Sequence, residues 1–449
     1  MLLWILACTA SDPDPMGADG GTDDTAPVEA TADTSTPVGT TGPTGDSGTD
    51  VGALPLLPEA LDCEVPGAPS EPEDSLGMVH RVVLSDVACN DGTPAVAYVR
   101  GALDPARAGD WVVQLDGGAF CDGGDACAAR WCGEGAYDAA DMSSSWSRET
   151  RKLGGLGSAM PSNAFAGWNQ VFVPYCTSDM WMGERRDAVL EADGVRYRAH
   201  FEGARVVDAL FDALEAGVSS DDGSEVLPAL IDADQLLFAG ASAGAMGVLV
   251  HLDAVAERLP AVSVTGLVDA LWSPDPADVA AAGVSDPAFD PAYVDAIEAY
   301  RQSLFEDAVV GLYGGRIESS CAASGIAPYL CIDPGVMQRD HVQTSFSMHH
   351  DLEDPVLAAL HLERGATIDA YASASVVGLQ DLASARPGLG VVGSSCRKHT
   401  VLGTTSWFQG MLVGAGARPV SVHDAAAAQL EGSPLVVIDT VDFATSECP

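Results

Sequence analysis

The sequence predicts an α/β fold, in which a mostly parallel central sheet is covered by helices on both faces and held by disulfides. From about Cys63 onward, short apolar runs bounded by polar or glycine residues alternate with segments of helical periodicity. Hydrophobic residues make up 47% of the 449 residues, which is enough for a large core. Ten cysteines follow Cys8, and an even number is typical of a disulfide framework.

Each expected element follows from its local pattern. The expected strands are apolar runs of strand length, and they lie at 111–115, 170–175, 235–239, 262–270, 342–348 and 434–439. Residues 204–217 carry apolar side chains at helical spacing and end on a glycine, which predicts a helix. Residues 243–259 predict a second helix directly after the strand at 235–239. Continuous apolar strands that alternate with helices favour parallel pairing with both faces covered.

The N-terminal residues have a different composition from the rest. Residues 1–8, MLLWILAC, resemble a bacterial lipoprotein signal in which Cys8 becomes the lipidated first residue. Residues 9–60 are rich in Asp, Thr, Gly and Pro, so we expect a solvated acidic tether. Residues 61–449 form a single expected domain. We therefore expect an extracytoplasmic monomer, lipid-anchored at the bacterial envelope, with a soluble secreted form as the alternative.

Charge and cysteine spacing exclude several classes of partner. The chain has 65 acidic against 21 basic residues and a net charge of −44, which repels phosphate backbones and argues against nucleic acid. We interpret the acidity as a solubility feature, with a basic partner or a calcium site as the alternative. The cysteines do not form the paired sets of a zinc site, and we expect no metal or cofactor. Cys321–Cys331 is the disulfide we expect most, because this pair is isolated in the sequence.

The stretch LFAGASAGAMG predicts a nucleophilic serine. It holds a G-x-S-x-G pattern centred on Ser242, between an apolar strand and a helix. That strand–turn–helix setting is what a nucleophile elbow requires, and small neighbours suit its crowded turn. The alternative is a glycine-rich helix start that only packs tightly or binds an anion.

An earlier glycine pair predicts the donors of an oxyanion hole. In LDGGAFC, an apolar strand runs into a loop where the backbone can approach a substrate closely. In serine hydrolases such a loop supplies amide donors together with the residue after the nucleophile. The expected donors are the backbone amides of Gly118, Ala119 and Ala243, and the alternative is a plain turn.

A serine nucleophile needs a histidine base and an acid that orients it. His399 lies in the polar loop GSSCRKHTVLG beside Cys396, and we prefer it to His361 and His423. His361 lies in an expected helix, and His423 precedes an alanine-rich one. Three aspartates at strand ends could supply the acid, and periodicity does not separate them: Asp269, Asp351 and Asp354.

Five pieces of the chain resemble the pectin acetylesterase family, which includes the Notum-type carboxylesterases. In family order, these are LDGGAFC, then Cys127 with Arg130, NAFAGWNQVFVPYC at 163–176, GASAGAMGVLVHLD and SSCRKHT. The resemblance implies an α/β-hydrolase-like fold with Ser242 as nucleophile, Asp351 as acid and His399 as base. It also implies ester cleavage without a metal or cofactor.

The expected reaction is therefore carboxylic ester hydrolysis through an acyl-enzyme, with O-acetyl groups of a polysaccharide as the leading substrate. One alternative is a lipase or deacylase of the same fold that acts on longer chains. The other is a surface-anchored binding protein without catalysis. The second alternative rests on a loose match around MHHDLED and on Thr400, which stands where the family has a cysteine.

Overall fold

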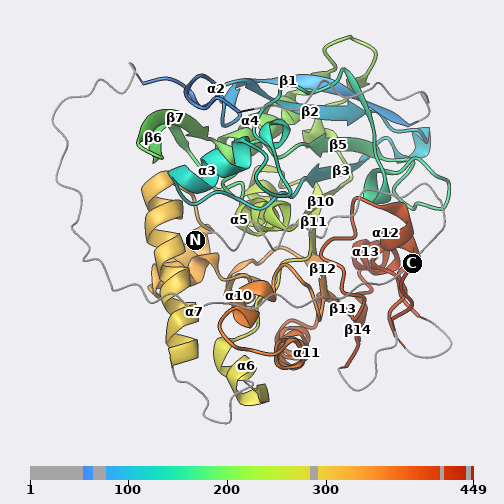
Figure 1. Ribbon diagram of the computed structural model, residues 1–449. Helices are drawn as coiled ribbons and strands as arrows, with labels where there is room; N and C mark the ends of the chain where they lie inside the picture. Colours follow the sequence, from blue (N-terminus) through green and yellow to red (C-terminus); the bar gives the residue numbers. More distant parts are fainter. Residues whose placement is uncertain (1–53, 64–76, 284–291, 415–418, 441–445) are drawn as a thin grey trace, which may run out of the picture.

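The computed structural model describes residues 54–63, 77–283, 292–414, 419–440 and 446–449. Its centre is a ten-stranded sheet in the order β14-β13-β12-β11-β10-β3-β5-β2-β1-β4. The strands from β14 to β5 in this order all pair in parallel, whereas β2, β1 and β4 pair antiparallel at one edge. Figure 1 shows the sheet crossing the molecule, with helices on both sides of it.

The strands of this sheet agree with the apolar runs of the sequence and add an N-terminal antiparallel part. Their bounds are β1 Met78–Ala88, β2 Pro94–Arg100, β3 Asp110–Leu115, β4 Thr150–Lys152, β5 Asn169–Val173, β10 Gln235–Ala241, β11 Ser263–Asp269, β12 Phe346–Asp351, β13 Gly390–Ser394 and β14 Val436–Ile438. Two small pairs lie outside it, β6 Arg185–Ala192 with β7 Val195–Phe201, and β8 Val218–Ser219 with β9 Val226–Leu227.

Helices cover both faces of the sheet. The α-helices are α2 Leu57–Ala60, α3 Gly124–Trp131, α4 Gly203–Ala216, α5 Ala243–Arg258, α6 Pro276–Gly283, α7 Ala292–Ser303, α8 Ser319–Ser324, α9 Pro334–Val336, α10 Ala359–Leu362, α11 Ile368–Ala385, α12 Thr405–Gly410 and α13 Val422–Leu430. The two helices predicted from periodicity are α4 and α5. Helices α4, α5 and α11 contribute to one buried cluster, and α12 and α13 to another.

Side chains alternate between these two clusters along the central strands. On β3, Val113 joins the cluster under α5 while Val112 joins the cluster under α13. On β10, Phe238 and Leu237 divide in the same way. Successive residues of a strand point to opposite faces, so an unbroken apolar strand needs a core on each side. This confirms the predicted mostly parallel sheet with helices on both faces.

Disulfides hold the described chain at five places. The pairs are Cys63–Cys132, Cys89–Cys176, Cys121–Cys127, Cys321–Cys331 and Cys396–Cys448. They confirm the expected pairing of Cys321 with Cys331 and the count of five. Disulfides of this density are typical of oxidising compartments outside the cytoplasm.

Residues 54–60 precede the expected domain boundary at residue 61, and they belong to the described part of the chain. Leu57 in α2 is fully buried, and the Arg198 side chain donates 2.8 Å to the carbonyl of Leu54. Residues 54–60 therefore pack onto the domain, because the apolar run ALPLLPEAL provides surface that the preceding acidic residues lack. The expected lipidation at Cys8, the signal at 1–8 and the tether up to residue 53 lie outside the described residues. Within the described ranges, no helix is long and apolar enough to cross a membrane.

Candidate active site

Ser242 occupies a sharp turn between β10 and α5 at the carboxyl edge of the sheet. Its backbone has φ 55° and ψ −119°, a conformation that non-glycine residues rarely adopt. Its amide donates 2.9 Å to the carbonyl of Asp269 at the end of β11. The turn tolerates only small neighbours: a Cβ on Gly240 would lie 2.1 Å from the Gly244 carbonyl oxygen, and a Cβ on Gly244 2.3 Å from the oxygen of Leu115. The glycines of the motif are therefore steric requirements of this turn.

His399 joins the serine to an aspartate. Nε2 of His399 lies 2.9 Å from Oγ of Ser242, within hydrogen-bond range. Nδ1 of the same ring lies 2.8 Å and 3.0 Å from the two carboxylate oxygens of Asp354. The three residues thus form one hydrogen-bonded chain, the arrangement in which an imidazole can take a serine proton while a carboxylate holds the ring.

The structure places Asp354, and not the Asp351 implied by the resemblance, beside His399. Asp351 does not contact His399; instead, its carboxylate accepts from the Ser394 hydroxyl at 2.7 Å and from the Cys396 amide at 2.7 Å. β12 ends at Asp351 and the chain then turns, with the Asp354 amide donating to the Asp351 carbonyl at 3.0 Å. That turn brings Asp354 to Nδ1 of the histidine ring. No sequence pattern distinguishes carboxylates three residues apart on such a turn.

The remaining candidates have other hydrogen-bond partners. Asp269, the third carboxylate, accepts from the amides of Val401 and Leu402 at 2.7 Å and 3.0 Å. His361 lies in α10, buried, with Nδ1 2.6 Å from the hydroxyl of Tyr293. His423 accepts from the amide of Ala164 at 2.9 Å.

The pair of His399 and Asp354 shifts the titration of both groups. Burial alone would raise the pKa of Asp354, but the charge of His399 and its hydrogen bond outweigh burial, so the pKa lies below the ordinary value. Burial alone would lower the pKa of His399, but the charge and hydrogen bond of Asp354 outweigh burial, so that pKa is raised. The ring is therefore a stronger base than a free histidine.

The glycine loop after β3 passes directly beside the serine. A Cβ on Gly117 would lie 2.6 Å from the Ala241 carbonyl and 3.2 Å from Cβ of Ser242. Gly118 and Ala119 both have positive φ, 148° and 54°. Within the described part of the chain, the amides of Gly118 and Ala119 take part in no hydrogen bond. Gly118 lines the same cavity as Ser242, Ala119 lines the neighbouring one, and Ala243 follows Ser242 at the start of α5.

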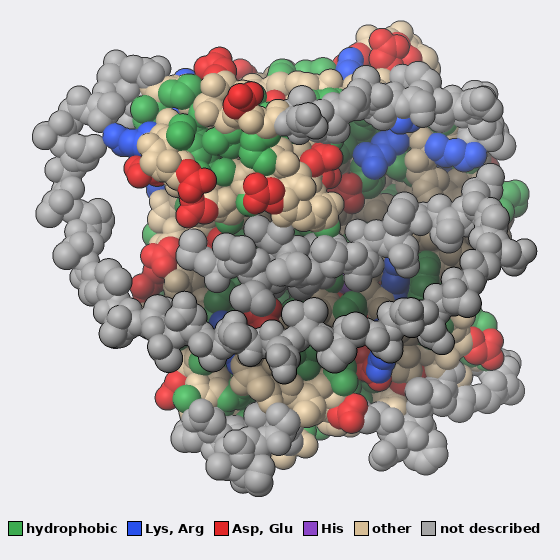
Figure 2. Space-filling view, viewed as in Figure 1, with side chains coloured by type: hydrophobic (Ala, Val, Ile, Leu, Met, Phe, Trp, Pro, Cys, Tyr) green, Lys and Arg blue, Asp and Glu red, His purple; other side chains and the backbone are tan. Residues whose placement is uncertain are grey.

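Ser242 and His399 line a cavity of about 380 Å³ whose wall carries positive charge. Both lysines of the sequence line it, Lys152 and Lys398, together with Arg151 and Arg397. Arg397 forms an ion pair with Glu353, and Nζ of Lys398 lies 5.2 Å from the ring centre of Trp407. Figure 2 shows red acidic side chains scattered over the visible face, with blue basic ones in a few groups. The scarcity of lysine was visible in the sequence, but the convergence of 151–152 and 397–398 requires the fold.

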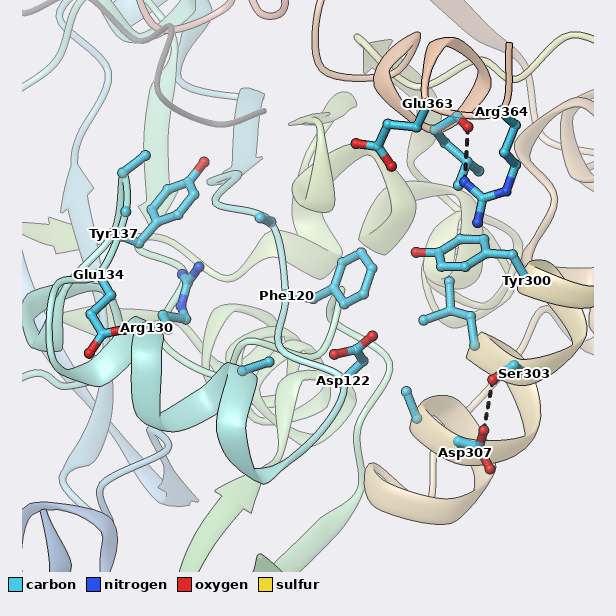
Figure 3. A pocket seen from close by; sticks show the side chains of 17 residues that line it. Phe120, Asp122, Arg130, Glu134, Tyr137, Tyr300, Ser303, Asp307, Glu363 and Arg364 are labelled. Carbon is cyan, nitrogen blue, oxygen red and sulfur yellow. Dashed lines mark hydrogen bonds between the residues drawn. The ribbon is translucent and has the colours of Figure 1, made fainter. Parts of the chain in front are cut away.

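A second cavity, of about 640 Å³, begins at the same glycine loop. Figure 3 shows Phe120 and Tyr300 turned toward each other inside it, with Asp122 below and Tyr137 to one side. Tyr137 also lines the cavity of Ser242, so the two cavities are neighbours. Leu304 and Leu360 add apolar surface.

Among the described residues, no group of three or more His, Cys, Asp or Glu is placed to hold a metal ion.

The chain is similar in sequence to known proteins. The profile of the family described as Pectinacetylesterase matches residues 70–346. The human palmitoleoyl-protein carboxylesterase NOTUM is 35% identical over 205 residues, which cover 43% of this chain and 36% of that protein. The Drosophila melanogaster protein of the same name is 30% identical over 250 residues, or 54% of this chain and 32% of that protein. The matches thus span about a third of the length of these relatives.

The fold is also similar to solved structures. A structure titled Wnt deacylase Notum from Drosophila superposes with a TM-score of 0.62 at 23% identity. The superposition covers 83% of this chain and 99% of that one. A second crystal form of the same protein gives a TM-score of 0.60 at 24% identity.

Proposed function

We propose that this chain, which belongs to the pectinacetylesterase family, is a serine carboxylesterase that works through an acyl-enzyme on Ser242. The observation that carries the proposal is the hydrogen-bonded chain from Ser242 through His399 to Asp354. Two further observations support the proposal: the strained backbone turn at Ser242 and the glycine loop that lies beside it.

The proposed reaction has two steps. In the first, Nε2 of His399 takes the Ser242 proton as Oγ attacks the ester carbonyl, and Asp354 stabilises the resulting imidazolium. The amides of the glycine loop and of Ala243 hold the negative oxygen of the tetrahedral intermediate. Collapse of that intermediate breaks the ester bond, and His399 returns its proton to the leaving alcohol. Water then attacks the acyl-enzyme by the same route and releases the carboxylic acid.

We propose an O-acylated, negatively charged glycan as the substrate, with acetyl as the acyl group. Support comes from Lys152, Lys398 and Arg151 around the cavity of Ser242, in a chain whose net charge is −44. Basic side chains at this cavity attract an anionic substrate there, whereas the net negative charge of the chain repels it elsewhere. The family description, Pectinacetylesterase, agrees with an acetylated acidic polysaccharide.

A longer acyl chain is the second candidate, and the larger cavity favours it. Its volume of about 640 Å³ exceeds what an acetyl group needs, and Phe120, Tyr300 and Leu304 give it an apolar lining. The relatives named palmitoleoyl-protein carboxylesterase indicate that the family includes proteins with a long-chain acyl substrate. Comparing p-nitrophenyl esters from acetyl to palmitoyl decides between the two candidates, since kcat/KM falls with chain length for an acetylesterase and rises for a long-chain deacylase.

Hydrolysis of p-nitrophenyl acetate tests the proposed activity. We expect turnover by the wild type, and loss of it in Ser242→Ala. Absence of turnover by the folded wild type on every short and long acyl ester would contradict the proposal and favour the binding protein without catalysis.

We also propose a monomer outside the cytoplasm, attached to a membrane through lipidated Cys8. Support comes from the five disulfides and from the lipoprotein-like residues 1–8. Expression with labelled palmitate tests the anchor, because the wild type should take up label and Cys8→Ser should not.

A further inference from the structure

A buried chain of four polar residues lies behind the candidate triad and takes no direct part in it. Asp269, His349, Asp351 and Ser394 are all fully buried. They stand on three neighbouring parallel strands, at or near the carboxyl ends of β11, β12 and β13. Buried polar groups of this kind are expensive unless each is hydrogen-bonded, so their partners show what the cluster does.

The four side chains are linked in a line. Nδ1 of His349 lies 2.7 Å from Oδ1 of Asp269, and its Nε2 lies 3.0 Å from Oγ of Ser394. The Ser394 hydroxyl donates to Oδ2 of Asp351 at 2.7 Å. The line therefore has a carboxylate at each end and connects strands β11, β12 and β13.

The two carboxylates at the ends of this line, Asp351 and Asp269, accept hydrogen bonds from the backbone of the loop that carries His399. Asp351 accepts from the amides of Cys396 at 2.7 Å and Arg397 at 3.1 Å, before the histidine. Asp269 accepts from the amides of Val401 at 2.7 Å and Leu402 at 3.0 Å, after it. The backbone on each side of His399 is thus fixed to a buried carboxylate, and the two carboxylates are fixed to each other.

Asp269 also holds the nucleophile. Its backbone carbonyl accepts from the amide of Ser242 at 2.9 Å, while its side chain holds the loop of His399. One residue therefore fixes the backbone of both proton-exchange partners, whose reacting atoms are 2.9 Å apart. Since displacements of about 1 Å can reduce a rate on the order of 100-fold, this shared anchor bears directly on the chemistry.

We infer that Asp269, His349, Ser394 and Asp351 form a buried clamp that sets the position of His399 relative to Ser242. His349 and Ser394 are the positioning residues of this clamp. They touch no reacting atom, and they act by fixing the orientation of the Asp269 and Asp351 carboxylates through hydrogen bonds. The inference rests on the proposed function for its kinetic consequences, but the clamp itself can be measured without any activity.

Two substitutions of His349 separate its two bonds. The amide nitrogen of Asn can occupy the place of Nδ1 and retain the bond to Asp269, whereas that of Gln can occupy the place of Nε2 and retain the bond to Ser394. Because Asp269 holds both Ser242 and the loop, His349→Asn should keep more activity than His349→Gln. We expect kcat on p-nitrophenyl acetate to fall about 10-fold in His349→Asn and about 100-fold in His349→Gln, with KM changed less than about twofold in both variants.

Ser394→Ala and a matched control complete the set. Ser394→Ala removes the link to Asp351 with little change in volume, and we expect kcat to fall about 10-fold. His361→Gln is the control, because His361 is equally buried but bonds Tyr293, away from the clamp. His361→Gln should lower the melting temperature, as we also expect for the His349 and Ser394 variants, but it should leave kcat unchanged.

Hydrogen–deuterium exchange tests the clamp independently of the esterase proposal. In the wild type, the amides of residues 396, 397, 401 and 402 should exchange as slowly as those of β12, and His349→Gln should accelerate them. Fast exchange in the wild type would overturn the clamp even if no variant folds. Folded clamp variants with unchanged kcat would also overturn it, whereas absence of hydrolysis by the wild type would count only against the proposed function.

Discussion

Nδ1 of His399 lies 2.8 Å from Oδ2 of Asp354, although 44 residues separate the two in the sequence and Asp351 stands closer to a strand end. Asp354 is fully buried, and its Oδ1 also accepts from the amides of Val356 and Leu357 at 2.9 Å and 3.0 Å. These backbone amides fix the orientation of the Asp354 carboxylate independently of the His399 ring, as an acid that orients a histidine requires.

Asp354→Asn should nearly abolish hydrolysis. The amide would remove the negative charge that stabilises the imidazolium and can favour the wrong tautomer of His399, so we expect kcat to fall on the order of 10⁴-fold. Steady-state kinetics with p-nitrophenyl acetate measures this loss. Glu353→Gln is the matched control, since this neighbouring carboxylate pairs with Arg397 and not with His399. Equal rates for the wild type and Asp354→Asn would rule out Asp354 as the acid.

Activity should decline on the acid side at a pH above that of an ordinary histidine. The mechanism needs neutral His399, and the charge of Asp354 raises the pKa of that ring above 6.5. As pH falls through the raised pKa, His399 gains a proton and kcat/KM declines. Removing the charge in Asp354→Asn should move the acid limb of the residual activity to lower pH. If the acid limb of the wild-type profile lies below pH 6 and Asp354→Asn does not move it, the assignment of Asp354 as the partner of His399 would be contradicted.

Lys152→Ala and Lys398→Ala should lower the activity on acidic polymers more than the activity on small neutral esters. Each removes one positive charge from the wall of the Ser242 cavity, so we expect KM for an acetylated polyuronate to rise about fivefold. The ratio of polymer to p-nitrophenyl acetate activity reports the effect. The wild type should also lose polymer affinity as NaCl rises, because salt screens such contacts. Salt-independent polymer kinetics would argue against an anionic substrate.

Leu304→Trp should reveal whether the larger cavity receives the acyl chain. The indole would fill part of the cavity that Tyr300 and Phe120 also line, which would shorten the longest acyl chain that fits. If the chain enters there, kcat/KM for octanoyl and longer esters should fall at least about 10-fold while acetyl ester hydrolysis persists. Unchanged profiles in a folded variant would place the acyl group elsewhere.

Local pattern was enough to predict the fold and to single out two residues, Ser242 and His399, that the structure places within hydrogen-bond distance of each other. The parallel strands were visible because strands buried on both faces are continuously apolar, as in residues 111–115 and 235–239. Ser242 could be found because a crowded strand–turn–helix needs Gly240 and Gly244 at fixed offsets. His399 could be found from its polar loop beside a cysteine.

The features that sequence missed depend on contacts between distant segments. The contact of His399 with Asp354 rather than Asp351 depends on a turn after β12 and on hydrogen bonds from residues 394–397, none of which leaves a local signal. The cavity wall joins residues 151–152 with 397–398, about 250 positions apart. Packing of Leu57 onto the domain likewise depends on the strand that contains Arg198.

Covalent labelling by a fluorophosphonate, read by intact-protein and peptide mass spectrometry, tests the central claim most directly. The account predicts one adduct per chain, located on Ser242, with none in Ser242→Ala and labelling slowed at least about 100-fold in His399→Ala. An unmodified Ser242 in protein that hydrolyses p-nitrophenyl acetate, or hydrolysis that persists at full rate in Ser242→Ala, would contradict it.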